Sequence, residues 1–133
     1  MREKYGVDIP MVMIDKTRTK ANEVDEMVLI GDVDGKDIVI VDDMADTLGT
    51  MCKAAELLID KGAKSVRAIA THGILSGKAY TNLESSVLTE LLVSDSIQAN
   101  ASPKLKVISC DRIIGKSIWG LVNRQSIHEL NAI

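Results

Sequence analysis

Two adjacent carboxylates followed by a short hydroxyl-rich loop are the residues of this chain best suited to chemistry. Asp42 and Asp43 follow the apolar residues 38–41, and residues 46–50 then read Asp-Thr-Leu-Gly-Thr. Neighbouring acids at the end of a strand can accept hydrogen bonds from the vicinal hydroxyls of a sugar, or orient hydrated Mg²⁺. The alternative is a pair of solvated acids near a helix start, where the helix dipole favours negative charge.

The loop of residues 46–50 indicates an anion site. Gly49 lacks a Cβ and lets the backbone approach a ligand, while Thr47 and Thr50 offer hydroxyl groups. The loop leads into a helical pattern, and the first amides of a helix have no intrahelical acceptor, so they can bind a phosphate monoester. An ordinary Asp or Thr cap on the helix is the alternative, and such caps are common.

A second candidate segment is basic. Lys16, Arg18 and Lys20 stand at every second position, so an extended backbone would point all three side chains the same way. Residues 9–14 predict a strand before this run, and residues 23–30 predict another strand after it. We therefore expect a hairpin whose basic loop forms a movable flap, with a solvated loop of no chemical role as the alternative.

The elements that must position these residues alternate between strands and helices. Such alternation is typical of an α/β fold with a mainly parallel sheet flanked by helices. The unbroken apolar run 38–41 favours a strand buried on both faces, and ligands of parallel sheets bind beyond the carboxyl ends of the strands. Further strands are predicted at residues 65–71, 88–93 and 104–109, helices at residues 77–86 and 112–122, and a loop at residues 94–103.

Two predicted helices carry apolar residues at helical spacing. The helix after the loop has an apolar face and ends at Lys61-Gly62, a typical helix terminus. That face consists of Leu48, Met51, Ala55 and Leu58. The last helix offers Ile113, Ile114, Ile118, Trp119 and Val122 for burial.

The composition indicates one globular domain of 133 residues, 46% hydrophobic and 26% charged. One Trp, two Tyr and a net charge of −3 disfavour nucleic-acid binding, which needs stacking rings and clustered cations. We find no secretory leader and no apolar run that could span a bilayer, so we expect no membrane association. We expect a cytoplasmic protein with Cys52 and Cys110 as free thiols.

The common phosphate loops are absent from the sequence. The pattern G-x-x-x-x-G-K-[ST] would need Gly before Gly115-Lys116-Ser117 at the position of Cys110, and no G-x-G-x-x-G run occurs. Residues 46–50 therefore predict a different kind of phosphate site.

Three ordered segments resemble one enzyme family. Residues 41–50, VDDMADTLGT, resemble the phosphoribosyl-diphosphate-binding motif of type I phosphoribosyltransferase folds, in the version carried by ribose-phosphate diphosphokinases (phosphoribosyl-pyrophosphate synthetases). The basic run 16–24 with segment 29–33 is similar to the catalytic flexible loop and following strand of these enzymes. Residues 70–73 with Ser76-Gly77 match a third segment. The resemblance implies a type I phosphoribosyltransferase-like fold.

The resemblance also implies an activity and a set of roles. These enzymes transfer the diphosphoryl group of Mg-ATP to the C1 hydroxyl of ribose 5-phosphate, giving phosphoribosyl diphosphate and AMP. By resemblance, Lys16 and Arg18 close over the reacting phosphates, with Arg18 also contacting the substrate, and Asp42 with Asp43 binds the ribose hydroxyls. The 5-phosphate would be bound by Asp46, Thr47, Leu48, Gly49 and Thr50. Mg²⁺ is implied together with ATP, and its main protein ligands are expected outside this chain.

Family members are more than twice as long and contain two similar domains. The resemblance therefore implies that residues 1–133 correspond to the carboxyl-terminal half, with the ATP-contacting segments outside the chain. We expect this chain to bind ribose 5-phosphate but to be inactive alone, and the full-length protein to form homo-oligomers.

Three alternatives remain open. A type I phosphoribosyltransferase shares the acidic motif but is disfavoured by the basic run that begins at Lys16. A non-catalytic regulatory subunit of the synthetase should have lost or interrupted residues such as Lys16, Arg18 or Asp42, which are intact here. An RNA-binding regulator built on the same fold is disfavoured by the net charge of −3.

Overall fold

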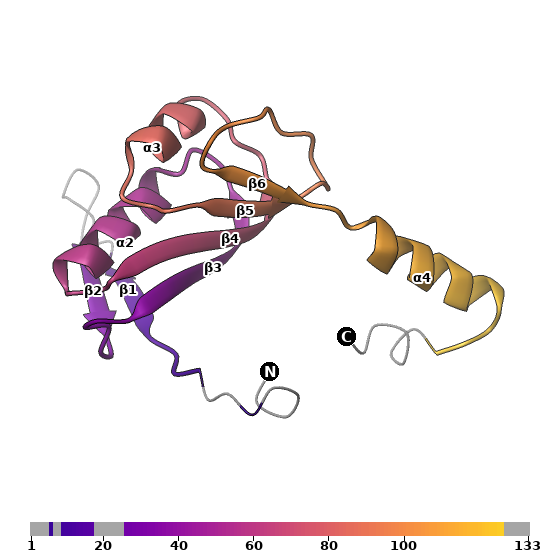
Figure 1. Cartoon of the computed structure of the whole chain (residues 1–133), viewed down its shortest axis with the longest axis horizontal. Helices are drawn as coiled ribbons and strands as arrows, with labels where there is room; N and C mark the ends of the chain where they lie inside the picture. The colour runs from indigo at the N-terminus through magenta and orange to yellow at the C-terminus, as the bar shows by residue number, and fades with distance from the viewer. Residues whose placement is uncertain (1–5, 7–8, 18–25, 127–133) are drawn as a thin grey trace.

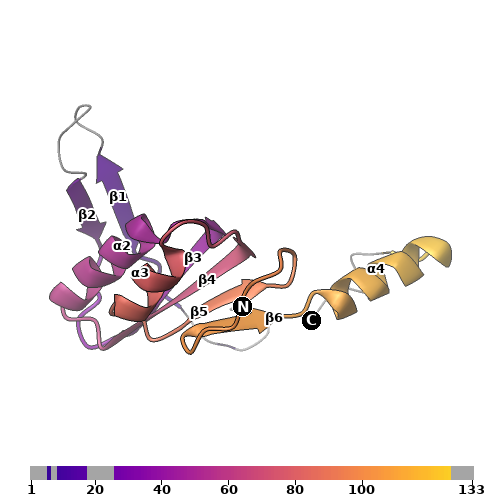
Figure 2. The same cartoon turned by 90° about the horizontal axis from the view of Figure 1, so that it is seen from above.

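The computed structural model describes residue 6 and residues 9–17 and 26–126, and it confirms an α/β fold with a mainly parallel sheet flanked by helices (Figure 1). An antiparallel hairpin is formed by β1 (Met13–Thr17) and β2 (Glu26–Ile30). The four-stranded parallel sheet, in the order β3-β4-β5-β6, consists of β3 (Asp37–Ala45), β4 (Ser65–Gly73), β5 (Leu91–Ser94) and β6 (Leu105–Ile108). Helices α2 (Gly49–Asp60) and α3 (Ala79–Ser85) lie on one face of this sheet, and α4 (Asp111–Val122) extends away from it (Figure 2).

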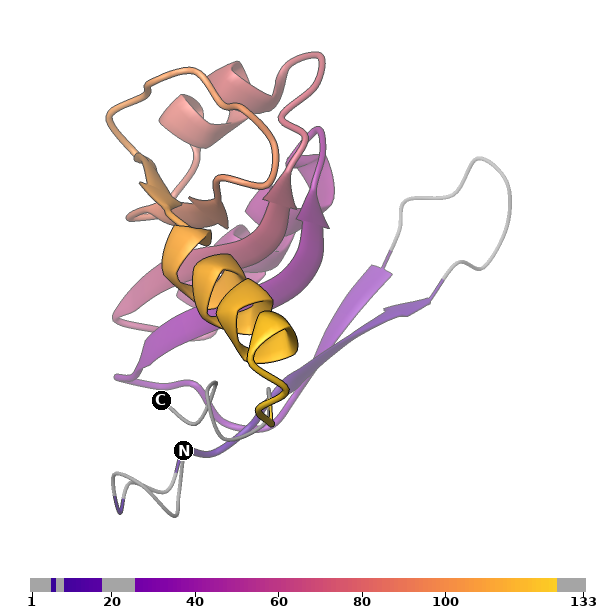
Figure 3. The same ribbon diagram turned by 90° about the vertical axis from the view of Figure 1, so that its right-hand side faces the viewer.

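The predicted hairpin is confirmed, but its first strand begins later than the sequence suggested. Strand β1 pairs with β2 from Met13 opposite Ile30 to Thr17 opposite Glu26. Pro10 lies before the strand, consistent with its missing N–H and restricted φ. Lys16 therefore belongs to the strand and not to the loop. The hairpin projects from the β3 side of the sheet (Figure 3), and its connection, residues 18–25, lies outside the described residues.

Strand β3 contains the predicted apolar run but is longer and less buried than expected. It continues through Asp42 and Asp43, so these acids are strand residues and do not lie in a loop. The expectation of burial on both faces is wrong, because Val39 is 50% exposed and Val41 is 77% exposed. Ile38 and Ile40 pack against the core, so the alternating residues Val39 and Val41 lie on the opposite face of β3, which forms one edge of the sheet.

The core lies between the sheet and its two helices. The predicted apolar face of α2 is buried, as are alternate residues of the adjacent strand β4, which follow the two-residue period of a strand. The helix ends where predicted, with Lys61 as its C-cap and Gly62 at a φ of 95°. The buried residues of this layer include Met51, Ala55, Leu58, Val66, Ala68 and Ala70.

The last helix forms as predicted, but its apolar residues are not buried. In α4 the exposed fractions are 47% for Ile113, 57% for Ile118 and 52% for Trp119. The reason is that α4 leaves the carboxyl end of β6 and runs away from the sheet (Figure 1). No helix within the described ranges is long and apolar enough to cross a membrane. Cys52 and Cys110 are free thiols, as expected.

Candidate functional site

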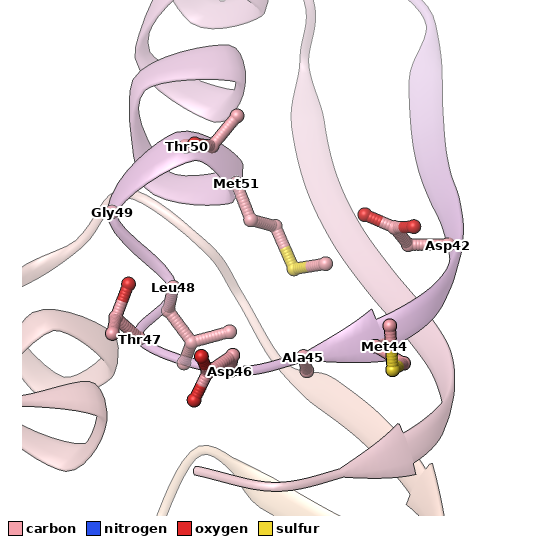
Figure 4. Close-up of a pocket in the computed structure, with 9 residues that line it drawn as sticks. All are labelled: Asp42, Met44, Ala45, Asp46, Thr47, Leu48, Gly49, Thr50 and Met51. Carbon is pink, nitrogen blue, oxygen red and sulfur yellow. The ribbon is translucent and has the colours of Figure 1, made fainter. Parts of the chain in front are cut away.

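A pocket of about 250 Å³ lies where β3 ends and α2 begins (Figure 4). It contains Asp42 and every residue of the predicted anion loop. The lining residues are Asp42, Met44, Ala45, Asp46, Thr47, Leu48, Gly49, Thr50 and Met51. The structure therefore brings the strand-end carboxylate and the loop together at the carboxyl edge of the sheet, where parallel sheets bind their ligands.

The loop is shaped by an unusual backbone conformation at Leu48. This residue is the N-cap of α2, its φ is 64°, and its side chain is buried. A left-handed conformation costs a residue with a Cβ about 1 kcal/mol. The cap has no side-chain hydrogen bond, so the alternative of an ordinary Asp or Thr cap is wrong. Such strained residues persist where the surrounding structure holds them, and they cluster at functional sites.

The N-terminus of α2 presents backbone amides to the pocket. The amide of Cys52 donates to the Leu48 carbonyl at 2.9 Å. Within the described part of the chain, no protein acceptor bonds the three preceding amides, those of Gly49, Thr50 and Met51. The first turn of α2 also contains no acidic residue. Free amides at the positive end of the helix dipole form a site for an anion.

Gly49 is not required by the fold. Its φ is not positive, and an added Cβ would lie 3.9 Å from the Thr47 hydroxyl oxygen, which is an ordinary contact. Neither backbone strain nor packing therefore explains a glycine here. Close approach of a ligand, the reason given by the sequence, stays a prediction.

The two adjacent acids are placed differently. The carboxylate of Asp42 points across the pocket toward Met51 (Figure 4). Asp43 does not line the pocket, because successive side chains of a strand point to opposite faces and Asp43 shares its face with Val41. Its backbone amide donates to Asp42 Oδ1 at 2.8 Å and so orients that carboxylate. The predicted contact of the Asp43 side chain with a ribose stays a prediction.

The basic residues lie on the hairpin. The backbone of Lys16 is in β1, opposite Met27. For Lys16 the structure describes only the backbone, and Arg18 lies outside the described residues. The structure therefore does not test whether either cation reaches the pocket. Their predicted roles over the reacting phosphates stay predictions.

Sequence reasoning missed the contacts that hold the loop from outside the pocket. Ser76 Oγ donates to Asp46 Oδ1 at 2.5 Å, and Asn82 Nδ2 donates to the Thr47 carbonyl at 2.8 Å. Ser76 belongs to the third segment that resembles the family, and that match was its only signal. The sequence carried no signal for Asn82, which lies on α3.

Comparison with known proteins agrees with this architecture. Residues 7–131 match the protein family described as the phosphoribosyl synthetase-associated domain. The ribose-phosphate pyrophosphokinase of Campylobacter jejuni is 47% identical over 126 residues, which are 94% of this chain and 40% of that protein. Ribose-phosphate pyrophosphokinase 3 of Saccharomyces cerevisiae is 45% identical over 128 residues, which are 93% of this chain and 40% of that protein.

A solved structure has the same fold. The crystal structure of phosphoribosylpyrophosphate synthetase from Mycobacterium smegmatis superposes with a TM-score of 0.78 at 33% sequence identity. The superposition covers 87% of this chain and 38% of that chain.

The fold and the comparisons together define the class, an α/β domain with the architecture of a phosphoribosylpyrophosphate synthetase. More specifically, the chain belongs to the phosphoribosyl synthetase-associated domain family, which confirms the resemblance found in its sequence. The chain spans about 40% of the length of the curated relatives it matches.

Proposed function

We propose that this chain supplies the ribose 5-phosphate site of a ribose-phosphate diphosphokinase. The observation that carries the proposal is the N-terminus of α2, where three amides without a protein acceptor open into the same pocket as Asp42. The helix N-terminus suits a phosphate monoester, and a carboxylate with two oxygens can accept hydrogen bonds from vicinal sugar hydroxyls. A ligand that carries both groups, such as ribose 5-phosphate, would use both features.

The catalytic part of the proposal concerns the hairpin. In the reaction, the C1 hydroxyl oxygen bonds to the β-phosphorus of ATP and loses its proton to solvent, the bond from that phosphorus to the α,β-bridging oxygen breaks, and AMP leaves. Lys16 and Arg18 would bring positive charge to the reacting phosphates. Transfer of phosphoryl groups depends mainly on such positioning and charge neutralisation.

Magnesium would enter this site with ATP. Among residues 9–17 and 26–126, no three His, Cys, Asp or Glu side chains are placed to hold a metal ion. We propose that the main ligands of Mg²⁺ are the phosphates of ATP and residues of another part of the enzyme, since Mg²⁺ usually binds through substrate phosphates and one or two carboxylates. Assembly into homo-oligomers remains part of this proposal.

Calorimetric titration of the chain with ribose 5-phosphate, with and without Mg²⁺, tests the binding site. We expect one equivalent to bind, and Asp46→Ala to weaken binding because it removes the carboxylate that Ser76 anchors. Absence of binding, or affinity unchanged by this substitution, would remove the central part of the proposal.

A chimera tests the enzyme class. The part of the Campylobacter jejuni protein that precedes the matched region would be joined to this chain, and AMP formation would be measured. We expect AMP to form from ATP only when ribose 5-phosphate is present, and Lys16→Ala to lose this activity while retaining ribose 5-phosphate binding. Nucleotide synthesis from phosphoribosyl diphosphate and a base would instead favour a phosphoribosyltransferase, and no activity would favour a regulatory subunit.

A further inference from the structure

The last residue of β3 and the first two residues of the loop that follows are each bonded to one segment, residues 75–82. This segment begins in the connection after β4 and ends within α3, and it contributes both backbone and side-chain donors. The three bonds are the Leu75 amide to the Ala45 carbonyl at 3.0 Å, Ser76 Oγ to Asp46 Oδ1 at 2.5 Å, and Asn82 Nδ2 to the Thr47 carbonyl at 2.8 Å. The loop is therefore fixed residue by residue up to the left-handed Leu48.

The bond from Asn82 controls the direction of one peptide group. The carbonyl of Thr47 and the amide of Leu48 belong to the same trans peptide, so they point in opposite directions. Asn82 lines a separate cavity and not this pocket, so the Thr47 carbonyl oxygen that it bonds is held toward that second cavity. A flipped peptide would instead turn this oxygen toward the site, where it would repel an anion.

We propose that Asn82 is a positioning residue for the anion site. Its side-chain amide holds the Thr47 carbonyl outside the pocket, which keeps Leu48 left-handed and leaves amides, not a carbonyl, facing the ligand. The effect on affinity rests on the proposed function, since the ligand must carry a phosphate. The effect on the backbone of the ligand-free protein does not.

The bond is not needed for burial. Thr47 is exposed, so water can bond its carbonyl when Asn82 is replaced. Loss of the Asn82 amide should therefore leave the fold intact and act on the orientation of the peptide. This distinguishes Asn82 from the buried residues of the same helix, Ala79 and Leu83, whose replacement would disturb the core.

The test uses Asn82→Ala with Asn123→Ala as a matched control. Asn123, the C-cap of α4, donates from Nδ2 to the Trp119 carbonyl at 2.7 Å, so the control removes the same kind of bond at the far end of α4, away from the pocket. In ligand-free protein, nuclear magnetic resonance should show a strong intraresidue contact between the amide proton and Hα of Leu48, as positive φ requires. We expect this signal to persist in Asn123→Ala and to weaken in Asn82→Ala.

Affinity for ribose 5-phosphate gives the second readout. Asn82→Ala should bind about tenfold more weakly, which is the order expected for one hydrogen bond that sets a binding geometry. Asn123→Ala should bind as the unmodified chain does.

Asn82→Asp supplies a readout that a packing role would not change. Its carboxylate cannot donate to the Thr47 carbonyl while it is ionised, and it gains a donor only as the pH falls to the carboxyl pKa, ordinarily about 3.9. The affinity deficit, measured against the unmodified chain at the same pH, should therefore be largest at neutral pH and shrink only as the pH falls toward about 4. Lys53 and Glu56 line a cavity together with Asn82, so these are the charged groups that the introduced carboxylate faces.

Two results would overturn the proposal. One is an Asn82→Ala protein that retains both the Leu48 signal and full affinity, and the other is a deficit in Asn82→Asp that does not change with pH. If the unmodified chain binds no ribose 5-phosphate, the proposed function fails, and the Leu48 signal alone decides whether Asn82 holds the loop.

Discussion

Helices α2 and α4 each begin shortly after a strand of the parallel sheet, yet their N-termini are satisfied in opposite ways. At α4 the Cys110 amide donates to Asp95 Oδ1 at 2.8 Å, and the Arg112 amide donates to Asp111 Oδ1 at 2.5 Å. At α2 the first turn has no acidic residue, and no described protein group accepts from its first three amides. An anion site thus forms at the helix N-terminus whose amides are not bonded by a carboxylate of the protein.

Asp95 shows how α4 is satisfied. Its carboxylate accepts from Ser109 Oγ at 2.5 Å as well as from the Cys110 amide. The hydrogen bond from Ser109, followed by that from Cys110, lowers the pKa of Asp95 below its ordinary value. Asp95 is therefore negatively charged at neutral pH beside the positive end of the α4 dipole. The same electrostatic position at α2 is suited to a ligand phosphate.

The largest expected effect comes from making α2 resemble α4. Gly49 is the first residue of α2, as Asp111 is of α4, and a Cβ at Gly49 meets only ordinary contacts. Gly49→Asp places a carboxylate where the phosphate would bind, so affinity for ribose 5-phosphate should fall about 100-fold through charge repulsion. Calorimetry measures this, with Gly49→Asn as the uncharged control of similar size.

The fold should not suffer from this change. An acid in the first turn of a helix is favourable by about 0.5 kcal/mol, so the melting temperature of Gly49→Asp should be unchanged or higher. Affinity equal to that of the unmodified chain would show that the α2 amides do not bind the phosphate. A loss of the same size in Gly49→Asn would assign the effect to side-chain volume and not to charge.

A smaller effect is expected from the two adjacent acids. Asp42→Asn should weaken ribose 5-phosphate binding about tenfold, because an amide replaces one acceptor oxygen with a donor. Its affinity for inorganic phosphate should not fall, since phosphate has no ribose hydroxyls. Asp43→Asn is the matched control, and the face on which Asp43 lies predicts little change. An equal loss in both variants would support the role that the family resemblance gives to Asp43.

The smallest effect concerns α4. The folded-state pKa of Asp95 is lowered, so its stabilising contribution is present above the ordinary carboxyl pKa of about 3.9 and is lost as the pH falls through the folded value. Asp95→Asn should therefore lower the melting temperature slightly at neutral pH, and the difference from the unmodified chain should shrink below about pH 4. Ribose 5-phosphate affinity should not change. A large loss of affinity in Asp95→Asn would mean that the two helix termini are not independent.

The sequence predicts the parts of the site that depend on neighbouring residues, and not the parts that depend on contacts between distant residues. The segment from β3 to α2 was predicted because its signals are local, an apolar run, a loop with Gly49, and apolar residues at helical spacing. The conformation of Leu48 was not predictable, because leucine rarely adopts a positive φ. Here that conformation depends on contacts from a distant segment, residues 75–82. The bond from Asn82 to Thr47 joins residues 35 positions apart and has no local signal.

The exposure of the apolar side chains on β3 and α4 could not be predicted from local sequence patterns either. An apolar pattern predicts which residues can be buried, but not whether another element covers them. Val41 is exposed because α2 and α3 lie on the other face of its sheet, and Ile118 is exposed because α4 leaves the sheet. The family resemblance supplied the expected roles of Lys16 and Arg18, which neither periodicity nor spacing could provide.

The most direct test of the central claim is a titration of the isotope-labelled chain with ribose 5-phosphate, followed through its backbone amide resonances. We predict saturable shifts at Gly49, Thr50 and Met51, and none at Cys110 or Arg112, because Asp95 and Asp111 already accept from those amides. Absence of shifts at the start of α2, or equal shifts at both helix termini, would contradict a specific phosphate site at this loop.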